Sequence, residues 1–339
     1  MINRHNFASV IKQYMSAFVE ERESQGFVTA PIVANMRSFD NFLVETMCAD
    51  PSISKEVYDR WIDSISHLSG HTIYLRACSV ISLLEYMCEV GCTCYIPRHP
   101  KTIKSEYIPY IFSESEMARI FDAADNWRDS VHRCDSHAMP MPALLRLLYS
   151  TGMRIGEAVA INNRDINYDK HVIHIYKTKN RRERLAPINE SLEKVLRQYA
   201  EYRNMMPIPD VDRPEKPFFI TSKGFRCHPH SIRLRFKKIL GVAGIPTAHD
   251  GHEVRVHDIR HTVCVHAMTS LARNGKDLYC ALPSISTFMG HLSVLSTEYY
   301  LRLTSVMYPE MFKKELLVTG PIHDLIVNAL KNIPNEEEQ

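Results

Sequence analysis

The chain has 339 residues, of which 45% are hydrophobic and 24% charged, a composition typical of a globular protein with room for two domains. No apolar run reaches membrane-spanning length and no apolar core follows Met1, so we expect a cytoplasmic protein with no membrane contact. The formal net charge is only +2, and the overall charge therefore neither indicates nor excludes nucleic acid as a partner.

The nine cysteines are odd in number and scattered, which argues against the disulfide framework of a secreted protein. The one cluster is Cys88, Cys92 and Cys94, with His99 nearby. Its spacings are irregular and no second pair of ligands follows, so we expect reduced, partly buried thiols and no metal site.

The first hundred residues carry the pattern of a small helical domain. Apolar residues at helical spacing, with Phe7 and Val10 among them, predict an amphipathic helix over residues 7–23. The third predicted helix opens at Ser54. Further helices are expected around residues 33–47, 54–67 and 71–90.

Two prolines, Pro97 and Pro100, stand among charged residues without periodicity, and Pro109 follows, which is typical of an interdomain linker. The sequence therefore predicts a helical domain over 1–98, a linker over 99–110, a second domain over 111–334 and an acidic tail over 335–339.

The second domain begins with Ser113 and Glu116 at the spacing of a capping box, which predicts a helix that runs to about Asn126. A leucine-rich helix over 142–150 is expected to stop at Gly152.

The period then changes from helical to alternating. Residues 171–176 and 184–188 predict an antiparallel pair of strands joined by a basic turn, and residues 217–220 predict a third strand. Helices return from residue 229. The fold class predicted is mainly α with a small antiparallel β-sheet (α+β).

Five separated motifs carry residues that suit phosphate chemistry. Arg154 follows Gly152, with Glu157 three residues later, and Lys179 lies in the basic turn. Each of these has an ordinary explanation when taken alone, namely a surface ion pair and a solvated lysine.

The remaining motifs lie near the C-terminal end of the second domain. His257 and Arg260 share one helical face because they are three residues apart. His291 follows a glycine, and Tyr300 comes nine residues later beside Tyr299.

The order of these motifs resembles the signature of the tyrosine recombinase (phage integrase) family. The matching sequence motifs are Thr-Gly-Met-Arg-Ile-Gly-Glu-Ala, Arg-Leu-Ala-Pro-Ile, His-Asp-Ile-Arg-His-Thr, Met-Gly-His and Ser-Thr-Glu-Tyr-Tyr. The resemblance covers roughly residues 110–310, and the first domain is similar to the family's helical, SAM-like core-binding domain that binds DNA.

The resemblance implies a catalytic set and one supporting acid. Tyr300 is preferred to Tyr299 by its spacing from the histidine, and Lys179 to Lys177 by counting back from Pro187. Glu157 resembles the acid that supports the first arginine. The family's catalytic positions correspond to Arg154, Lys179, His257, Arg260, His291 and Tyr300.

The resemblance also implies the reaction, in which DNA strands are cut and rejoined through a 3′-phosphotyrosine without a cofactor, a metal or ATP. The arginines suit the charge of the transition state, because guanidinium stays charged and donates to two oxygens. Lys179 is the implied general acid, His257 suits proton transfer to or from the tyrosine, and His291 would hydrogen-bond the phosphate.

Double-stranded DNA is the partner implied, bound by a homotetramer on two recombination sites, with possible accessory directionality or DNA-bending proteins. We expect a nucleoid-associated protein of a prokaryote. The family exchanges C-terminal helices between protomers, and residues 322–330 could be that exchanged helix or could dock on their own domain. The DNA-binding candidates are Arg181, Arg182, Arg233, Arg235, Lys237 and Lys238.

Several functions stay open at this point. Residues 274–283 form a segment longer than that of compact family members, which we interpret as an extended loop before His291 and which favours the integrase of a mobile element. The alternatives are a Xer-like resolvase of chromosome or plasmid dimers, a type IB topoisomerase-like enzyme and a non-catalytic DNA-binding factor. Suitable residues at all six catalytic positions argue against the last.

Overall fold

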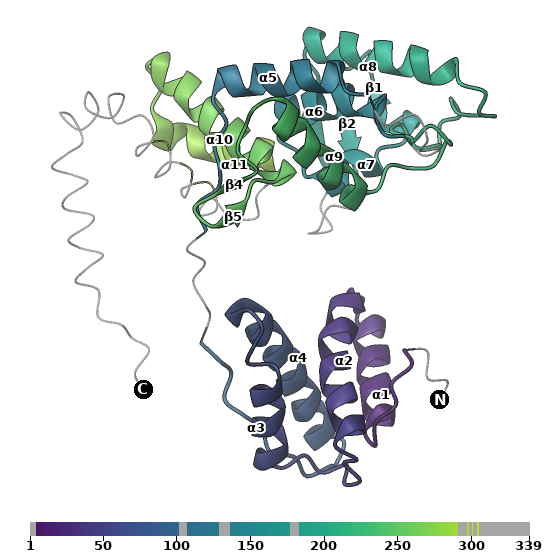
Figure 1. Cartoon of the computed structure of the whole chain (residues 1–339), viewed down its shortest axis with the longest axis vertical. Helices are drawn as coiled ribbons and strands as arrows, with labels where there is room; N and C mark the ends of the chain where they lie inside the picture. Colours follow the sequence, from purple (N-terminus) through teal and green to yellow (C-terminus); the bar gives the residue numbers. More distant parts are fainter. Residues whose placement is uncertain are drawn as a thin grey trace, which may run out of the picture. The chain divides into compact units, whose positions relative to one another are not determined.

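The structure, a computed structural model, describes residues 5–101, 107–128, 136–176 and 183–290, together with Thr297, Tyr300 and Thr304. The chain divides into two compact units, residues 1–106 and 107–339 (Figure 1). This division falls inside the segment expected to be a linker, and the finer domain boundaries stay predictions. In the part of the chain that is described, no helix combines the length and the apolar character needed to cross a membrane.

The first unit is a set of four helices around an aromatic core (Figure 1). Trp61 is fully buried, and its ring lies 5.0 Å from that of Phe39 and 5.6 Å from that of Tyr58. Each large aromatic side chain buries on the order of 150–250 Å², so this cluster contributes strongly to the core. The helices are α1 (Lys12–Ser24), α2 (Ala30–Glu45), α3 (Lys55–Ser64) and α4 (Gly70–Glu89).

The prediction for the first helix is wrong at its start, since α1 begins at Lys12 and not near residue 7. The backbone N–H groups of Ala8 and Ser9 donate to the buried carboxylate of Asp40 in α2, at 3.0 Å and 2.9 Å, and so they need no helical partners. Phe7 is buried as predicted, whereas Val10 is exposed. The start of α3 is confirmed, because the Ser54 hydroxyl accepts from the N–H of Val57.

The second unit is built around α6, which packs against α5, α8 and α10. Both bonds of the predicted Ser113–Glu116 capping box are present, and α6 ends at Gly152 as predicted. The helices are α5 (Glu114–Asp125), α6 (Pro140–Thr151), α7 (Ile155–Ala160), the 3₁₀ turn η1 (Asn163–Asp165), α8 (Glu190–Asn204), α9 (Pro229–Val242), α10 (Val256–Arg273) and α11 (Leu278–Met289).

A three-stranded antiparallel sheet has the order β1 (Ile166–Asn167), β2 (Val172–Ile175) and β3 (Arg184–Pro187). The predicted pairing of β2 with β3 is confirmed, with Ile173 opposite Ala186. The third strand was predicted in the wrong place, because residues 217–220 form only isolated bridges to Asn162 and Arg226. A second ribbon joins β4 (Ala248–His249) and β5 (His252–Glu253). The mainly helical fold with a small antiparallel sheet is confirmed.

The extended loop predicted over 274–283 is wrong, since helix α11 begins at Leu278. Asp277 caps it by accepting from the N–H groups of Tyr279 and Cys280. Buried residues at helical spacing, including Leu282, hold this helix on the core, and this apolar stripe offsets the hydrogen bond lost at Pro283.

Candidate active site

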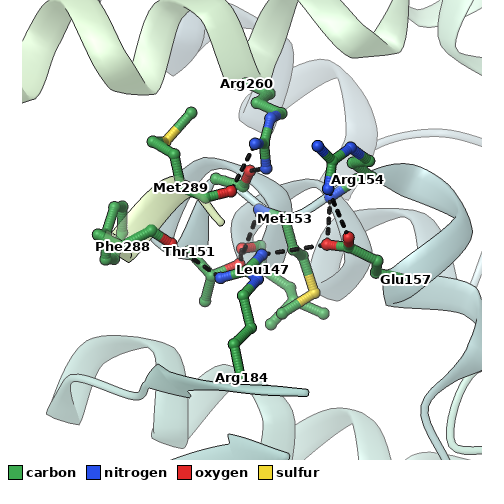
Figure 2. Close-up of polar contacts among 10 residues, drawn as sticks. Leu147, Thr151, Met153, Arg154, Glu157, Arg184, Arg260, Phe288 and Met289 are labelled. Carbon is green, nitrogen blue, oxygen red and sulfur yellow. Dashed lines mark hydrogen bonds and ion pairs between the residues drawn. The ribbon is translucent and has the colours of Figure 1, made fainter. Parts of the chain in front are cut away.

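The site begins at the sharp corner between α6 and α7 (Figure 2). Gly152 adopts a left-handed conformation with φ of +59°, and a Cβ there would come within 2.8 Å of the Met289 sulfur. Only glycine permits both the turn and this close approach. The corner therefore brings Arg154, at the start of α7, next to the end of α11.

Glu157 holds Arg154 in place from one turn further along α7. One carboxylate oxygen accepts from Nη1 of Arg154 at 2.9 Å, and the other accepts from the backbone N–H of Arg154 at 3.0 Å (Figure 2). Burial raises the pKa of Glu157, but the backbone hydrogen bond from Arg154, the charge of Arg184 and the side-chain hydrogen bonds from both arginines outweigh it, so the net pKa lies below its ordinary value. Glu157 is therefore an ionised, buried carboxylate that fixes the arginine.

Arg184 is a residue of this site that the sequence analysis did not single out. Its Nη2 donates to Glu157 at 3.0 Å and its Nη1 donates to the carbonyl of Phe288 at 2.8 Å (Figure 2). A Cβ on Gly290 would come within 2.8 Å of the Arg184 side chain. One side chain thus connects β3, α7 and the end of α11. Arg184 is the first residue of the Arg-Leu-Ala-Pro-Ile motif, but nothing in the sequence pattern distinguished it from a surface residue.

Arg260 reaches the same corner from α10 (Figure 2). It is 3% exposed and donates to the carbonyls of Gly152 and Met289. Burial and the charge of Arg154 lower the pKa of Arg260, while Glu157 and Tyr300 raise it, with a result of about 10. Arg260 is therefore charged at neutral pH, and a second guanidinium lies within electrostatic reach of it.

His257 lies one turn before Arg260 on the same helix. Its pKa falls to about 4, first because the half-buried ring is partly removed from water and then because Arg260, Arg255, Arg154 and Arg233 are positively charged. His257 is consequently neutral at pH 7 in the free protein.

Tyr300 is 5% exposed, and its hydroxyl lies 2.7 Å from Nδ1 of His261. The two rings are 5.5 Å apart. His261 directly follows Arg260, and its ring meets the ring of His257 edge to face at 4.8 Å. His261 belongs to the His-Asp-Ile-Arg-His-Thr motif, but no role was predicted for it, since nothing in the sequence places it against Tyr300.

The start of α10 is held by a buried acid. Asp258 accepts from the backbone N–H of Arg255 at 2.7 Å and from the hydroxyl of Tyr107 at 2.7 Å. The Tyr107 ring also stacks under the guanidinium of Arg255 at 4.3 Å. These contacts fix the first turn of α10, from which His257 projects.

The basic candidates on α9 are mostly exposed. Arg233, Lys237 and Lys238 are exposed and Arg235 is half-buried, and Lys237 forms a 2.7 Å ion pair with Glu253. Arg233 is close enough to lower the pKa of His257. A basic face therefore borders the site.

Other predicted residues lie outside the described part of the chain, namely Lys179, Arg181, Arg182, His291, Tyr299 and the segment 322–330. Within the described ranges, no three histidine, cysteine or acidic side chains gather in a way that would hold a metal ion.

Comparison with known proteins gives a match within the second unit. A sequence profile described as "Phage integrase family" matches residues 111–306. The integrase/recombinase y4rE of Sinorhizobium fredii (strain NBRC 101917 / NGR234) is 25% identical over 87% of this chain and 92% of its own. The tyrosine recombinase XerC of Chlamydia caviae is 30% identical over 61% of this chain and 57% of its own.

Among solved structures, the fold is similar to that of the XerH site-specific recombinase bound to difH substrate in a pre-cleavage complex. The TM-score is 0.62 at 17% identity, over 86% of this chain and 82% of that one.

Proposed function

The chain belongs to the phage integrase family and is a tyrosine-type site-specific DNA recombinase; we propose that it cuts and rejoins DNA through a 3′-phosphotyrosine formed on Tyr300. The observation that carries this proposal is the corner where Arg260 lies within electrostatic reach of both Arg154 and Tyr300.

Two buried or half-buried guanidinium groups repel each other, and one ionised carboxylate offsets only part of their charge. A bound phosphate diester would supply the missing negative charge. Preorganised donors of this kind stabilise the charge of a transition state by on the order of 3 kcal/mol each. The corner is therefore suited to the nonbridging oxygens of a scissile phosphate.

The remaining roles follow from the resemblance and complete the reaction. The Tyr300 oxygen would attack phosphorus while the bond to the 5′ oxygen breaks, and Lys179 would give that oxygen its proton. His291 would hydrogen-bond the phosphate, and Glu157 keeps Arg154 oriented. His257 is neutral in the free protein, so it would act there as a hydrogen-bond partner and not as a further cation.

DNA would lie along the exposed basic residues of α9, with Arg181 and Arg182 as further candidates in the turn before β3. Basic side chains on a near-neutral protein bind the phosphate backbone and position the duplex. We expect a homotetramer on two DNA sites in the cytoplasm of a prokaryote, at the nucleoid. Segment 322–330 is proposed as the exchanged helix, and accessory bending or directionality proteins as partners.

Within this reaction class, we favour integration or excision of a mobile element. Support comes from the similarity to y4rE, which extends over 87% of the chain, whereas the similarity to XerC covers 61%. An extended loop over residues 274–283 does not support the mobile-element role, because most of that segment lies in α11. The XerC similarity, at 30% identity, keeps a dimer resolvase as the second candidate.

The reaction is tested by cleavage of nicked duplexes taken from DNA that flanks the gene. The nick releases a short 5′-hydroxyl fragment, so the covalent complex accumulates and is seen on a denaturing gel. We expect a complex with the wild-type chain and with Tyr299→Phe, and none with Tyr300→Phe. A complex that survives in Tyr300→Phe would overturn the assignment of the nucleophile.

The biological role is tested in cells. A mobile-element enzyme produces a circular junction of the DNA segment that carries its gene, detectable by amplification across the joined ends. A resolvase gives no such junction, and its deletion causes chromosome or plasmid dimers to accumulate. Relaxation of a supercoiled plasmid without a recombination site would instead indicate the topoisomerase-like activity.

A further inference from the structure

His261 contacts the hydroxyl of Tyr300, the group that must lose its proton in the proposed reaction. Its Nδ1 lies 2.7 Å from the Tyr300 hydroxyl, a normal hydrogen-bond length, and the rings are tilted by 35°. The phenol is the natural donor of this pair, with Nδ1 as the acceptor of a neutral imidazole.

The position of His261 on α10 makes this contact specific. Arg260 points toward the corner carbonyls of Gly152 and Met289, while the next residue points toward Tyr300. The helix therefore presents a phosphate-binding group and a base from two consecutive residues.

His257 is the other imidazole on this side of the helix, and it is poorly suited to take the proton. Burial first, and nearby arginines second, lower its pKa to about 4. No hydrogen bond between His257 and Tyr300 occurs among the contacts of the described residues, and the ring of His261 stands edge-on against the ring of His257.

The positive charge of Arg260 acts on the hydroxyl of Tyr300. The ring of His257 contacts the ring of His261, and Arg260 interacts electrostatically with Tyr300, while Arg154 acts on both His257 and Arg260. Since Tyr300 raises the pKa of Arg260, the positive charge of Arg260 equally stabilises a phenolate at Tyr300.

We propose that His261 is a catalytic residue that accepts the proton of Tyr300 through Nδ1 as the tyrosine oxygen attacks the phosphorus. This inference rests on the proposed function. The bond from oxygen to hydrogen and the bond from phosphorus to the 5′ oxygen break, and the bond from tyrosine oxygen to phosphorus forms. The phenolic proton moves to His261, and the leaving oxygen takes its proton from Lys179. In ligation, His261 returns the proton to Tyr300.

The test compares two histidine–tyrosine pairs on the same helix. His266 makes an equivalent bond, 2.9 Å from its Nδ1 to the hydroxyl of Tyr149, away from the corner. The full-length variants His261→Asn and His261→Phe are measured beside His266→Asn. Asparagine can keep a hydrogen bond to the tyrosine but cannot take up a proton at neutral pH.

The readout is the single-turnover rate of covalent-complex formation on a nicked duplex between pH 6 and pH 9.5. We expect both His261 variants to cleave about 100-fold to 10,000-fold more slowly at pH 7, as is typical when a general base is lost. The deficit should shrink as the pH approaches about 10, the ordinary pKa of tyrosine, because the phenol then ionises without a base. A variant that is merely misfolded would not recover in this way. The folded fraction of His266→Asn should cleave at the wild-type rate.

Two results would overturn the inference, and they are distinguishable. If the wild-type chain forms the complex and His261→Asn matches it in rate and pH dependence, His261 takes no proton although the proposed function stands. If the wild-type chain forms no complex on any flanking duplex, the proposed function fails and the inference fails with it.

Discussion

The two units of the chain bury charge very differently. In the first unit, Asp40 is the one charged side chain that is buried among the described residues. The described part of the second unit buries Glu157, Asp165, Arg203, Asp258 and Arg260. An ion removed from water costs several kcal/mol unless partners compensate it, so a fold keeps such groups only where they are well satisfied or where they are used.

Two buried arginines show how these cases differ. Arg203 donates to Asn163 and to the carbonyl of Phe218, and so it connects α8 with the 3₁₀ turn η1 and with the segment that contains Phe218. Arg260 lies beside a second guanidinium and a tyrosine. We interpret the first as architecture and the second as an arrangement that a phosphate would complete.

The largest effect is expected at Glu157, because its removal leaves Arg184 and Arg154 without their buried counterion. Glu157→Ala should lower the free energy of unfolding of the second unit by about 3–5 kcal/mol, as is typical when one partner of a buried pair is lost. The chain has two tryptophans, Trp61 and Trp127, one in each unit, so urea unfolding of the second unit can be followed by Trp127 fluorescence in a Trp61→Phe background. Trp61 fluorescence in Trp127→Phe should show an unchanged first unit. A loss below about 1 kcal/mol would contradict the buried-counterion interpretation.

Arg260→Ala and Arg203→Ala separate the two kinds of buried arginine. We expect Arg260→Ala to slow strand cleavage by about 100-fold to 1,000-fold, since one preorganised donor to the transition state is lost. Arg203→Ala should lower stability while its folded fraction cleaves at nearly the wild-type rate. The measurement is single-turnover cleavage, corrected for the folded fraction by fluorescence. Equal losses of cleavage rate in both variants would contradict the interpretation that Arg203 is structural and Arg260 belongs to the active site.

His257 should make the second unit sensitive to acid. Its pKa is about 4 in the folded protein and about 6.5 in the unfolded chain, so the unfolded state binds the proton first as the pH falls. Stability is therefore complete above pH 6.5 and declines toward pH 4, by roughly 3 kcal/mol at about 1.36 kcal/mol for each unit by which the two pKa values differ. His257→Asn should flatten this decline in urea unfolding followed by Trp127. Parallel curves for the two chains would show that burial of His257 carries no such cost.

The smallest effect concerns the exposed face of α9. Arg233→Ala and Lys238→Ala should each reduce the dependence of DNA affinity on salt by about one unit of log–log slope, if each side chain neutralises one phosphate. Lys237→Ala should change the slope less, because Lys237 already pairs with Glu253 at 2.7 Å. Titrations of labelled duplex at several salt concentrations measure the slopes. Unchanged slopes for Arg233 and Lys238 would exclude α9 from the interface.

The sequence predicted what local chemistry determines. The Ser113–Glu116 box, the stop at Gly152 and the β2–β3 pairing follow from capping, a left-handed glycine and alternation, and all three are confirmed. Predictions failed where tertiary contacts override local pattern. The Asp40 carboxylate accepts from backbone N–H groups ahead of α1, where the helix was predicted to begin. Burial of the apolar residues of α11 offsets the hydrogen bond lost at Pro283.

The site was predictable only as far as its motifs. The motifs around Arg154, Arg260 and Tyr300 indicated the family. The family profile that matches residues 111–306 shows that the chain belongs to it. Arg184 and His261 belong to the same motifs, yet Arg184 bonds to Glu157, about 27 positions away in the chain, and His261 to Tyr300, about 39 positions away. Such long-range partners leave no periodic trace in a single sequence, so these two roles required the structure.

The most direct measurement is peptide mapping of the covalent complex. The wild-type chain would be trapped on a nicked flanking duplex, digested with protease and nuclease, and analysed by fragmentation mass spectrometry that resolves adjacent tyrosines. We predict a nucleotide phosphate on Tyr300, lost in Tyr300→Phe and strongly reduced in Arg260→Ala. A phosphate on Tyr299, or on any residue away from the corner of Arg154 and Arg260, would contradict it.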